Sequence, residues 1–166
     1  VGIQITPRPP NIEFTSLICF ITGFVFGSKF GASLGALTMF INGFLSPSGF
    51  AGIIMPFQMV GMMIMGLVGG VYKRSLKGNP CSSRLVRVEV AFLVAFLTLV
   101  YDLLTNVGYA IMFGKYVIVA FVTGVPLTIV HVVSNTALFG TTFFGLVKVI
   151  NNLLGEKIWS YQKGAW

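Results

Sequence analysis

The stretch KRSLKGNPCSSRLVRVEVAFLVAFLTLVYDLLTN (residues 73–106) joins a basic segment directly to a long apolar one. Its first fifteen residues, 73–87, include five basic side chains: Lys73, Arg74, Lys77, Arg84 and Arg87. The remainder, 88–106, is close to the roughly 20 mostly apolar residues that cross the hydrocarbon core of a bilayer as a helix. Because short loops rich in Lys and Arg stay on the cytoplasmic side, the stretch predicts a membrane helix that leaves a cytoplasmic basic loop.

The composition of the whole chain supports the same class. Of its 166 residues, 55% are hydrophobic and only 9% are charged, whereas a soluble domain carries about 25% charged residues. We therefore expect an all-α integral membrane protein. The net charge of +7 sits in short loops beside apolar runs, so the positive-inside rule accounts for it and no nucleic-acid partner is expected.

Four more apolar runs, 12–28, 30–45, 56–72 and about 126–154, bring the expected number of membrane helices to five in a single transmembrane domain, 1–166. Residues 1–11 are predicted to form an outer loop, and 109–123 an outer, partly embedded segment. Two crossings within 107–154 are the alternative, but they would strand Lys148, Lys157 and Lys163 outside. One crossing places nine of the eleven basic residues, and the C-terminus, in the cytoplasm.

With this topology the chain begins outside, and its first residue is Val1 rather than Met. We therefore expect a sixth helix to precede it in the natural protein; the alternative is that five is the full number. Glycine pairs at helical spacing, such as Gly23 and Gly27 or Gly66 and Gly70, predict close packing within the bundle, with a docking face for a partner helix as the less favoured interpretation.

Polar residues gather towards the outer half of these helices. Asp102 lies fifteen residues after Arg87, roughly 22 Å along its helix. Asn106 lies on the same face as Asp102, and His131 and Asn135 form a second i, i+4 pair. Polar groups inside a membrane are costly and need partners or a wet cavity. We therefore predict a substrate pocket formed by Glu13, Asn42, Gln58, Asp102, Asn106, Tyr109, His131 and Asn135.

Other functional classes find little support. The chain has one His and no Glu-Glu pair, so an intramembrane protease of the CAAX type and a His-based metal site are both disfavoured. No GxxxxGK[ST] motif is present, so an ATP-driven step would need another chain. We expect no catalysis, no cofactor and no disulfide between Cys19 and Cys81. A channel or secondary transporter would need polar lining in the inner half, where Gly, Phe, Leu and Val dominate.

Several segments resemble the substrate-binding S components of energy-coupling-factor (ECF) transporters. These segments are NIEFTSL (11–17), GFVFGSKFGASLGAL (23–37), YDLLTN (101–106) and GVP (124–126) leading to His131 and Asn135. The resemblance implies a six-helix protein of the prokaryotic plasma membrane that captures a vitamin or related micronutrient from outside. It also implies three partner chains, namely a transmembrane coupling protein and two cytoplasmic ATPases.

On this resemblance the loop before Asn11 acts as a gate and residues 46–55 as a second lid. The polar groups are compatible with riboflavin and with cobalamin-like, pyridoxal-like and purine-like ligands. The competing interpretation is a structural or assembly protein of the membrane whose polar groups only bond helices together.

Overall fold

In the computed structural model of the chain, residues 14–45, 50–76 and 84–154 are described, and their regular structure is entirely helical. The elements are α2 (Thr15–Phe26), α3 (Ser28–Leu45), α4 (Ile54–Ser75), α5 (Arg84–Met112), α6 (Val117–Leu138), the π-helical segment η2 (Phe139–Phe143) and α7 (Phe144–Leu154). Three stretches, Ile54–Ser75, Leu85–Met112 and Val117–Ile150, are long and apolar enough to cross a bilayer, and α2 is a shorter apolar helix. These observations confirm the all-α membrane fold, while the number of crossings stays a prediction.

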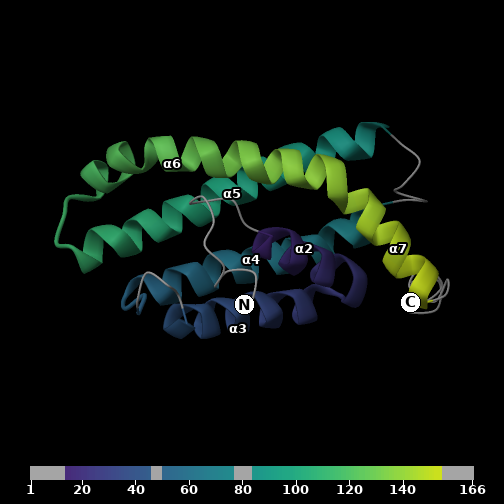
Figure 1. Ribbon diagram of the computed structural model, residues 1–166, viewed down its shortest axis with the longest axis horizontal. Helices are drawn as coiled ribbons and strands as arrows, with labels where there is room; N and C mark the ends of the chain where they lie inside the picture. Colours follow the sequence, from purple (N-terminus) through teal and green to yellow (C-terminus); the bar gives the residue numbers. More distant parts are fainter. Residues whose placement is uncertain (1–13, 46–49, 77–83, 155–166) are drawn as a thin grey trace.

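The helices form two antiparallel pairs with α2 between them (Figure 1). The pair α5 and α6 lies along one side and the pair α3 and α4 along the other, and α2 packs on α3 and α4. One end of this bundle carries the short connection between α5 and α6, and we call it the turn end. The opposite end, where α4 finishes with Lys73 and Arg74, we call the basic end.

Glycines bring α2, α3 and α4 into backbone contact. A Cβ atom at Gly23 of α2 or at Gly31 of α3 would collide with the carbonyl oxygen of Gly66 on α4. A Cβ at Gly70 would collide with Ser28 in the same way. Small residues allow this approach where lipid removes the hydrophobic drive for association, so these glycines serve packing inside the bundle.

The core of the bundle half nearer the basic end, called the basic half, is made of aromatic side chains; the other half is called the turn half. Phe20 and Phe24 of α2 meet Phe139 and Phe143 of η2, with ring centroids 5.3 to 5.6 Å apart and the rings edge to face. All four side chains are at most 1% exposed. Edge-to-face pairs add to the stabilisation from burial alone, so this cluster joins α2 firmly to the last helical run.

Side-chain bonds at the basic end connect α4 to its neighbours. The Nζ of the buried Lys73 donates to the carbonyl oxygen of Val25 at 3.2 Å, near the end of α2. The hydroxyl of Tyr72 donates to Glu89 of α5 at 3.1 Å. Lys73 thus caps a helix C-terminus, where unpaired carbonyls and the helix dipole both favour a cation.

The helix boundaries differ from the sequence-based expectation most strongly in the segment expected at 109–123. There α5 continues to Met112 and α6 begins at Val117, so only residues 113–116 connect them. Gly114, with φ of 60°, makes this turn. Pro126, expected near a helix start, lies inside α6 instead. Proline is tolerated within membrane helices because local adjustments and neighbouring groups satisfy the freed backbone.

The other expected runs match helices with shifted ends. The runs 12–28, 30–45, 56–72 and 88–106 correspond to α2, α3, α4 and α5, and the last two helices extend into the basic loop expected at 73–87. The expected outer loop 1–11 and Glu13 lie outside the described residues, as does part of the lid expected at 46–55.

Candidate functional site

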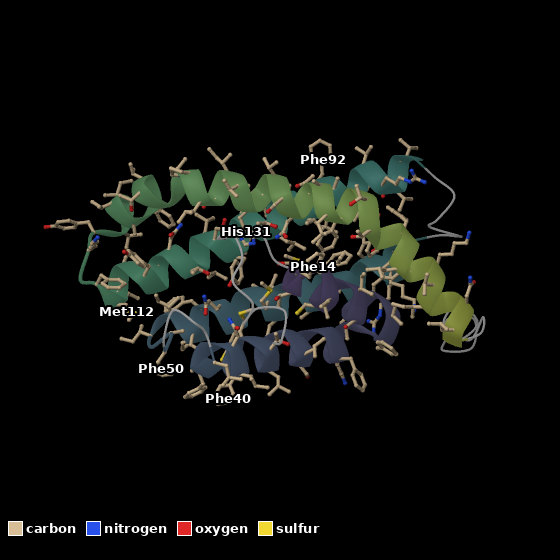
Figure 2. All side chains as sticks on the ribbon, viewed as in Figure 1. Phe14, Phe40, Phe50, Phe92, Met112 and His131 are labelled. Atoms are coloured by element: carbon tan, nitrogen blue, oxygen red, sulfur yellow. The ribbon has the colours of Figure 1, made fainter. Side chains whose placement is uncertain are left out.

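Three of the predicted site residues meet inside the bundle at the junction of α5 and α6. Asp102, His131 and Asn135 are 9%, 3% and 1% exposed, respectively. Figure 2 shows His131 directed from α6 into the bundle interior, whereas Phe40 and Phe92 point outwards. Side chains that point outwards from such a bundle face lipid, so the polar residues are sequestered from it.

The innermost layer of this cluster is centred on Asn135. Its Nδ2 donates to Thr98 Oγ1 of α5 at 3.1 Å and to Ser16 Oγ of α2 at 3.4 Å. Thr98 in turn donates to the carbonyl oxygen of Val94 at 2.8 Å. Ser16 donates to the sulfur of Met62 on α4 at 4.0 Å. Four helices are therefore linked through one amide near the middle of the bundle.

One helical turn closer to the turn end, His131 pairs with Asp102. The Nδ1 of His131 and Oδ1 of Asp102 are 2.7 Å apart. This distance is that of a strong hydrogen bond between the two side chains. The ring of Tyr101 stands edge to face against the imidazole, with centroids 5.7 Å apart. The hydroxyl of Tyr101 donates to the sulfur of Met39 at 3.9 Å, so α3 also reaches this layer.

Two oxygen atoms of the cluster remain without a hydrogen-bond partner in the described part of the chain: Oδ2 of Asp102 and Oδ1 of Asn135. Both atoms are buried. Most buried polar groups in folded proteins have a partner, and an unmet one in a native structure calls for an explanation such as a functional role or a bound molecule. The cluster therefore holds its helices together and still has two acceptors available.

The remaining predicted residues lie nearer the turn end. The Asn106 amide lies so close to α6 that a Cβ at Gly124 would be 2.9 Å from its side-chain atoms, which makes Asn106 part of the α5–α6 contact. The Tyr109 ring packs on Phe113 at 4.5 Å, and the Nζ of Lys115 lies 5.6 Å from its centroid. Tyr109 comes seven residues after Asp102, about 10 Å further along the helix.

Asn42 and Gln58 stand on the opposite pair of helices. Both are partly buried, Asn42 on α3 and Gln58 on α4. The Oδ1 of Asn42 is buried without a partner in the described residues. No hydrogen bond connects either side chain to the Asp102 cluster within these residues. The structure thus brings three of the predicted residues together and places Asn42, Gln58, Asn106 and Tyr109 around them.

Ser16 and Thr98 belong to the cluster but were not among the predicted site residues. Thr98 precedes Asp102 by four residues, so the spacing that relates Asp102 to Asn106 would also have included it. Ser16 lies in the NIEFTSL segment, one residue after the start of α2. A hydroxyl in an apolar helix commonly bonds the backbone of its own helix. The sequence alone therefore does not predict that Ser16 contacts a side chain on another helix.

Comparison with known proteins identifies the family. A family model described as the ECF-type riboflavin transporter, S component, matches residues 1–148. No curated protein and no solved structure matches the chain. The matched region contains all of α2 to α6 and the whole polar cluster, which confirms the resemblance noted in the sequence. The chain therefore belongs to the S components of ECF-type riboflavin transporters, the vitamin-binding subunits of these systems.

Proposed function

We propose that this protein captures riboflavin from outside the cell and presents it for ATP-driven uptake. The family supplies the ligand class. Riboflavin has a flat ring system that is apolar at one edge and rich in hydrogen-bonding groups at the other, with a chain of hydroxyls. Such a ligand suits a site with apolar walls and a few well-placed polar groups.

The observation that carries the proposal is the buried cluster of Asp102, His131 and Asn135. An ionisable pair inside a membrane protein is expensive and is a functional-site hypothesis by default. Here it is accompanied by two buried acceptors without partners. Asn42 and Gln58 on the facing helices, and Tyr109 towards the turn end, extend the proposed pocket, and Asn106 borders it. Glu13 remains in the proposal from the sequence alone.

The orientation follows from charge. Lys73, Arg74 and Arg87 lie at the basic end, which the positive-inside rule places in the cytoplasm together with the C-terminus. The turn end, towards which Asp102 and His131 lie relative to Asn135, then faces outwards in a prokaryotic plasma membrane. A vitamin would reach the cluster from that side.

The same proposal assigns the energy source to other chains. A coupling protein in the membrane and two cytoplasmic ATPases would supply ATP hydrolysis, and this chain would bind the vitamin without catalysing a reaction. Coexpression of the chain with such a module should give riboflavin uptake that depends on the ATPases, whereas uptake by the chain alone would contradict this assignment.

The first test is to identify what the purified protein carries. Protein purified gently from riboflavin-fed cells should release about one riboflavin per chain, measured by mass spectrometry. The double variant Asp102→Asn/Asn135→Ala, prepared in parallel, should release far less while eluting as the same monodisperse species. If both proteins carry only lipid, the polar cluster serves to bond helices together and the transport proposal is wrong.

A further inference from the structure

The amide of Asn135 is oriented by two hydroxyls, each of which accepts from it and donates elsewhere. The hydrogen of Thr98 is directed at the carbonyl oxygen of Val94, and that of Ser16 at the sulfur of Met62. Each oxygen is then left as an acceptor, and Nδ2 supplies both of its hydrogens, one to each. With these hydroxyl orientations a flipped amide would lose both bonds, so Oδ1 is the atom left without a partner in the described residues.

The carboxylate of Asp102 is fixed in a similar way. Its Oδ1 is hydrogen-bonded with Nδ1 of His131, while Tyr101 supports the imidazole with the edge contact between the two rings. The second oxygen, Oδ2, is left without a partner in the described residues. Since His131 and Asn135 are one helical turn apart on α6, the two available acceptors lie in adjacent layers.

We infer that Oδ2 of Asp102 and Oδ1 of Asn135 select the ligand by its hydrogen-bond donors, and that Thr98 and Ser16 are positioning residues that aim the Asn135 acceptor. This inference rests on the proposed riboflavin site. Both oxygen atoms accept hydrogen bonds, so the ligand must supply the donors.

Riboflavin offers two kinds of donor to such a pair. One is the N3–H of the ring, which lies between two carbonyl groups, and the other is the set of hydroxyls on the ribityl chain. The stronger acceptor is the charged carboxylate, because hydrogen bonds to ionised groups are roughly twice as strong as neutral ones. The N3–H is therefore assigned to Asp102 and a ribityl hydroxyl to Asn135.

The positioning role is tested with matched threonine variants of α5. Thr98 and Thr105 both bond the carbonyl four residues earlier, at 2.8 and 2.9 Å, but only Thr98 also accepts from Asn135. Thr98→Val keeps the shape and removes the acceptor, so riboflavin should bind about tenfold more weakly by fluorescence-quenching titration. Thr98→Ser should restore most of the affinity, and Thr105→Val should leave it within about twofold.

A merely structural role for Thr98 would give a different pattern. In that case Thr98→Val and Thr105→Val would lower the melting temperature and the affinity together, or Thr98→Val would leave the affinity unchanged. Either result overturns the positioning role. The ratio of riboflavin to lumiflavin affinity adds a second readout: lumiflavin lacks the ribityl hydroxyls, so this ratio should fall in Thr98→Val if Asn135 binds one of them.

The contact assigned to Asp102 is tested by changing the ligand. N3-methylriboflavin lacks the ring donor and should bind the wild-type protein more than about tenfold more weakly than riboflavin. In Asp102→Asn, where the charged acceptor is gone, the penalty for methylation should shrink to about threefold. A steric effect of the methyl group alone would give the same penalty in both proteins and would overturn the assignment.

These outcomes separate the two proposals. Saturable riboflavin binding to wild-type protein that is indifferent to N3 methylation and to Thr98→Val refutes only the donor-selective contact. An absence of saturable riboflavin binding refutes the proposed function, and the inference falls with it.

Discussion

The half of the bundle nearer the basic end and the half nearer the turn end differ in the side chains that fill the space between their helices. In the basic half, glycines on α2, α3 and α4 let backbones touch, and four phenylalanine rings fill the remaining space. Towards the turn end, glycine contacts continue at Gly61 and Gly108. Carboxylate, imidazole, amide and hydroxyl groups are added to them and also join the helices. The polar cluster of the second arrangement leaves two buried acceptors, Oδ2 of Asp102 and Oδ1 of Asn135, without partners in the described residues. Stability is therefore expected to depend mainly on the basic half, and ligand affinity on the turn half.

The largest loss of stability is expected from a substitution at the glycine contact between α2 and α4. Gly23→Val adds atoms where a Cβ already meets the backbone of Gly66, so the helices must separate, and we expect a loss of about 3 kcal/mol or more. The readout is the fraction of monodisperse protein in detergent and its melting temperature. Gly140→Val is the matched control, because nothing lies within 4 Å of a Cβ there. Equal behaviour of the two variants would contradict the packing role.

A second variant tests whether the aromatic cluster serves stability alone. Phe139→Ala removes a ring that is 0% exposed and contacts Phe20, which should cost about 3 kcal/mol of stability. Protein that remains folded at low temperature should bind riboflavin with an affinity close to that of the wild type. A large loss of affinity in folded protein would show that the two halves are not separable.

Asp102→Asn should have the reverse effect. The substitution keeps the size of the side chain and a hydrogen bond with His131, so the melting temperature should change little. Replacing the charged acceptor should weaken riboflavin binding by about 1.5 kcal/mol, roughly tenfold. Titration and thermal unfolding of the same preparation separate the two quantities. If the melting temperature falls sharply and the affinity does not, the carboxylate serves only to hold helices.

The smallest effect is expected at Tyr109. Its ring packs on Phe113, about 10 Å along the helix from Asp102, so removing only the hydroxyl in Tyr109→Phe should change riboflavin affinity by less than about threefold. The same titration measures it. A loss as large as that for Asp102→Asn would extend the binding site to the turn end and would mean that the cluster alone does not define it.

These contrasts also explain what the sequence could predict. Runs of apolar residues identified the helical class, and the i, i+4 pairs correctly grouped His131 with Asn135. The pairing of Asp102 with His131 could not be predicted from the sequence, because it depends on the axial offset between α5 and α6. The expected helix start near Pro126 was wrong, since a proline is tolerated inside a membrane helix. Gly124, two residues earlier, allows the close approach of Asn106.

The π-helical segment has a geometric consequence for the last helical run. The residues of this run that face the bundle, His131, Asn135, Phe139, Phe143 and Val147, are spaced by four, and all are at most 3% exposed. A regular helix of 3.6 residues per turn would rotate its contact line by about 160° over these sixteen residues. The wider turn at 139–143 absorbs part of that rotation. One surface of the chain can thus carry an amide at one level and phenylalanine rings at the next, all facing the same neighbours.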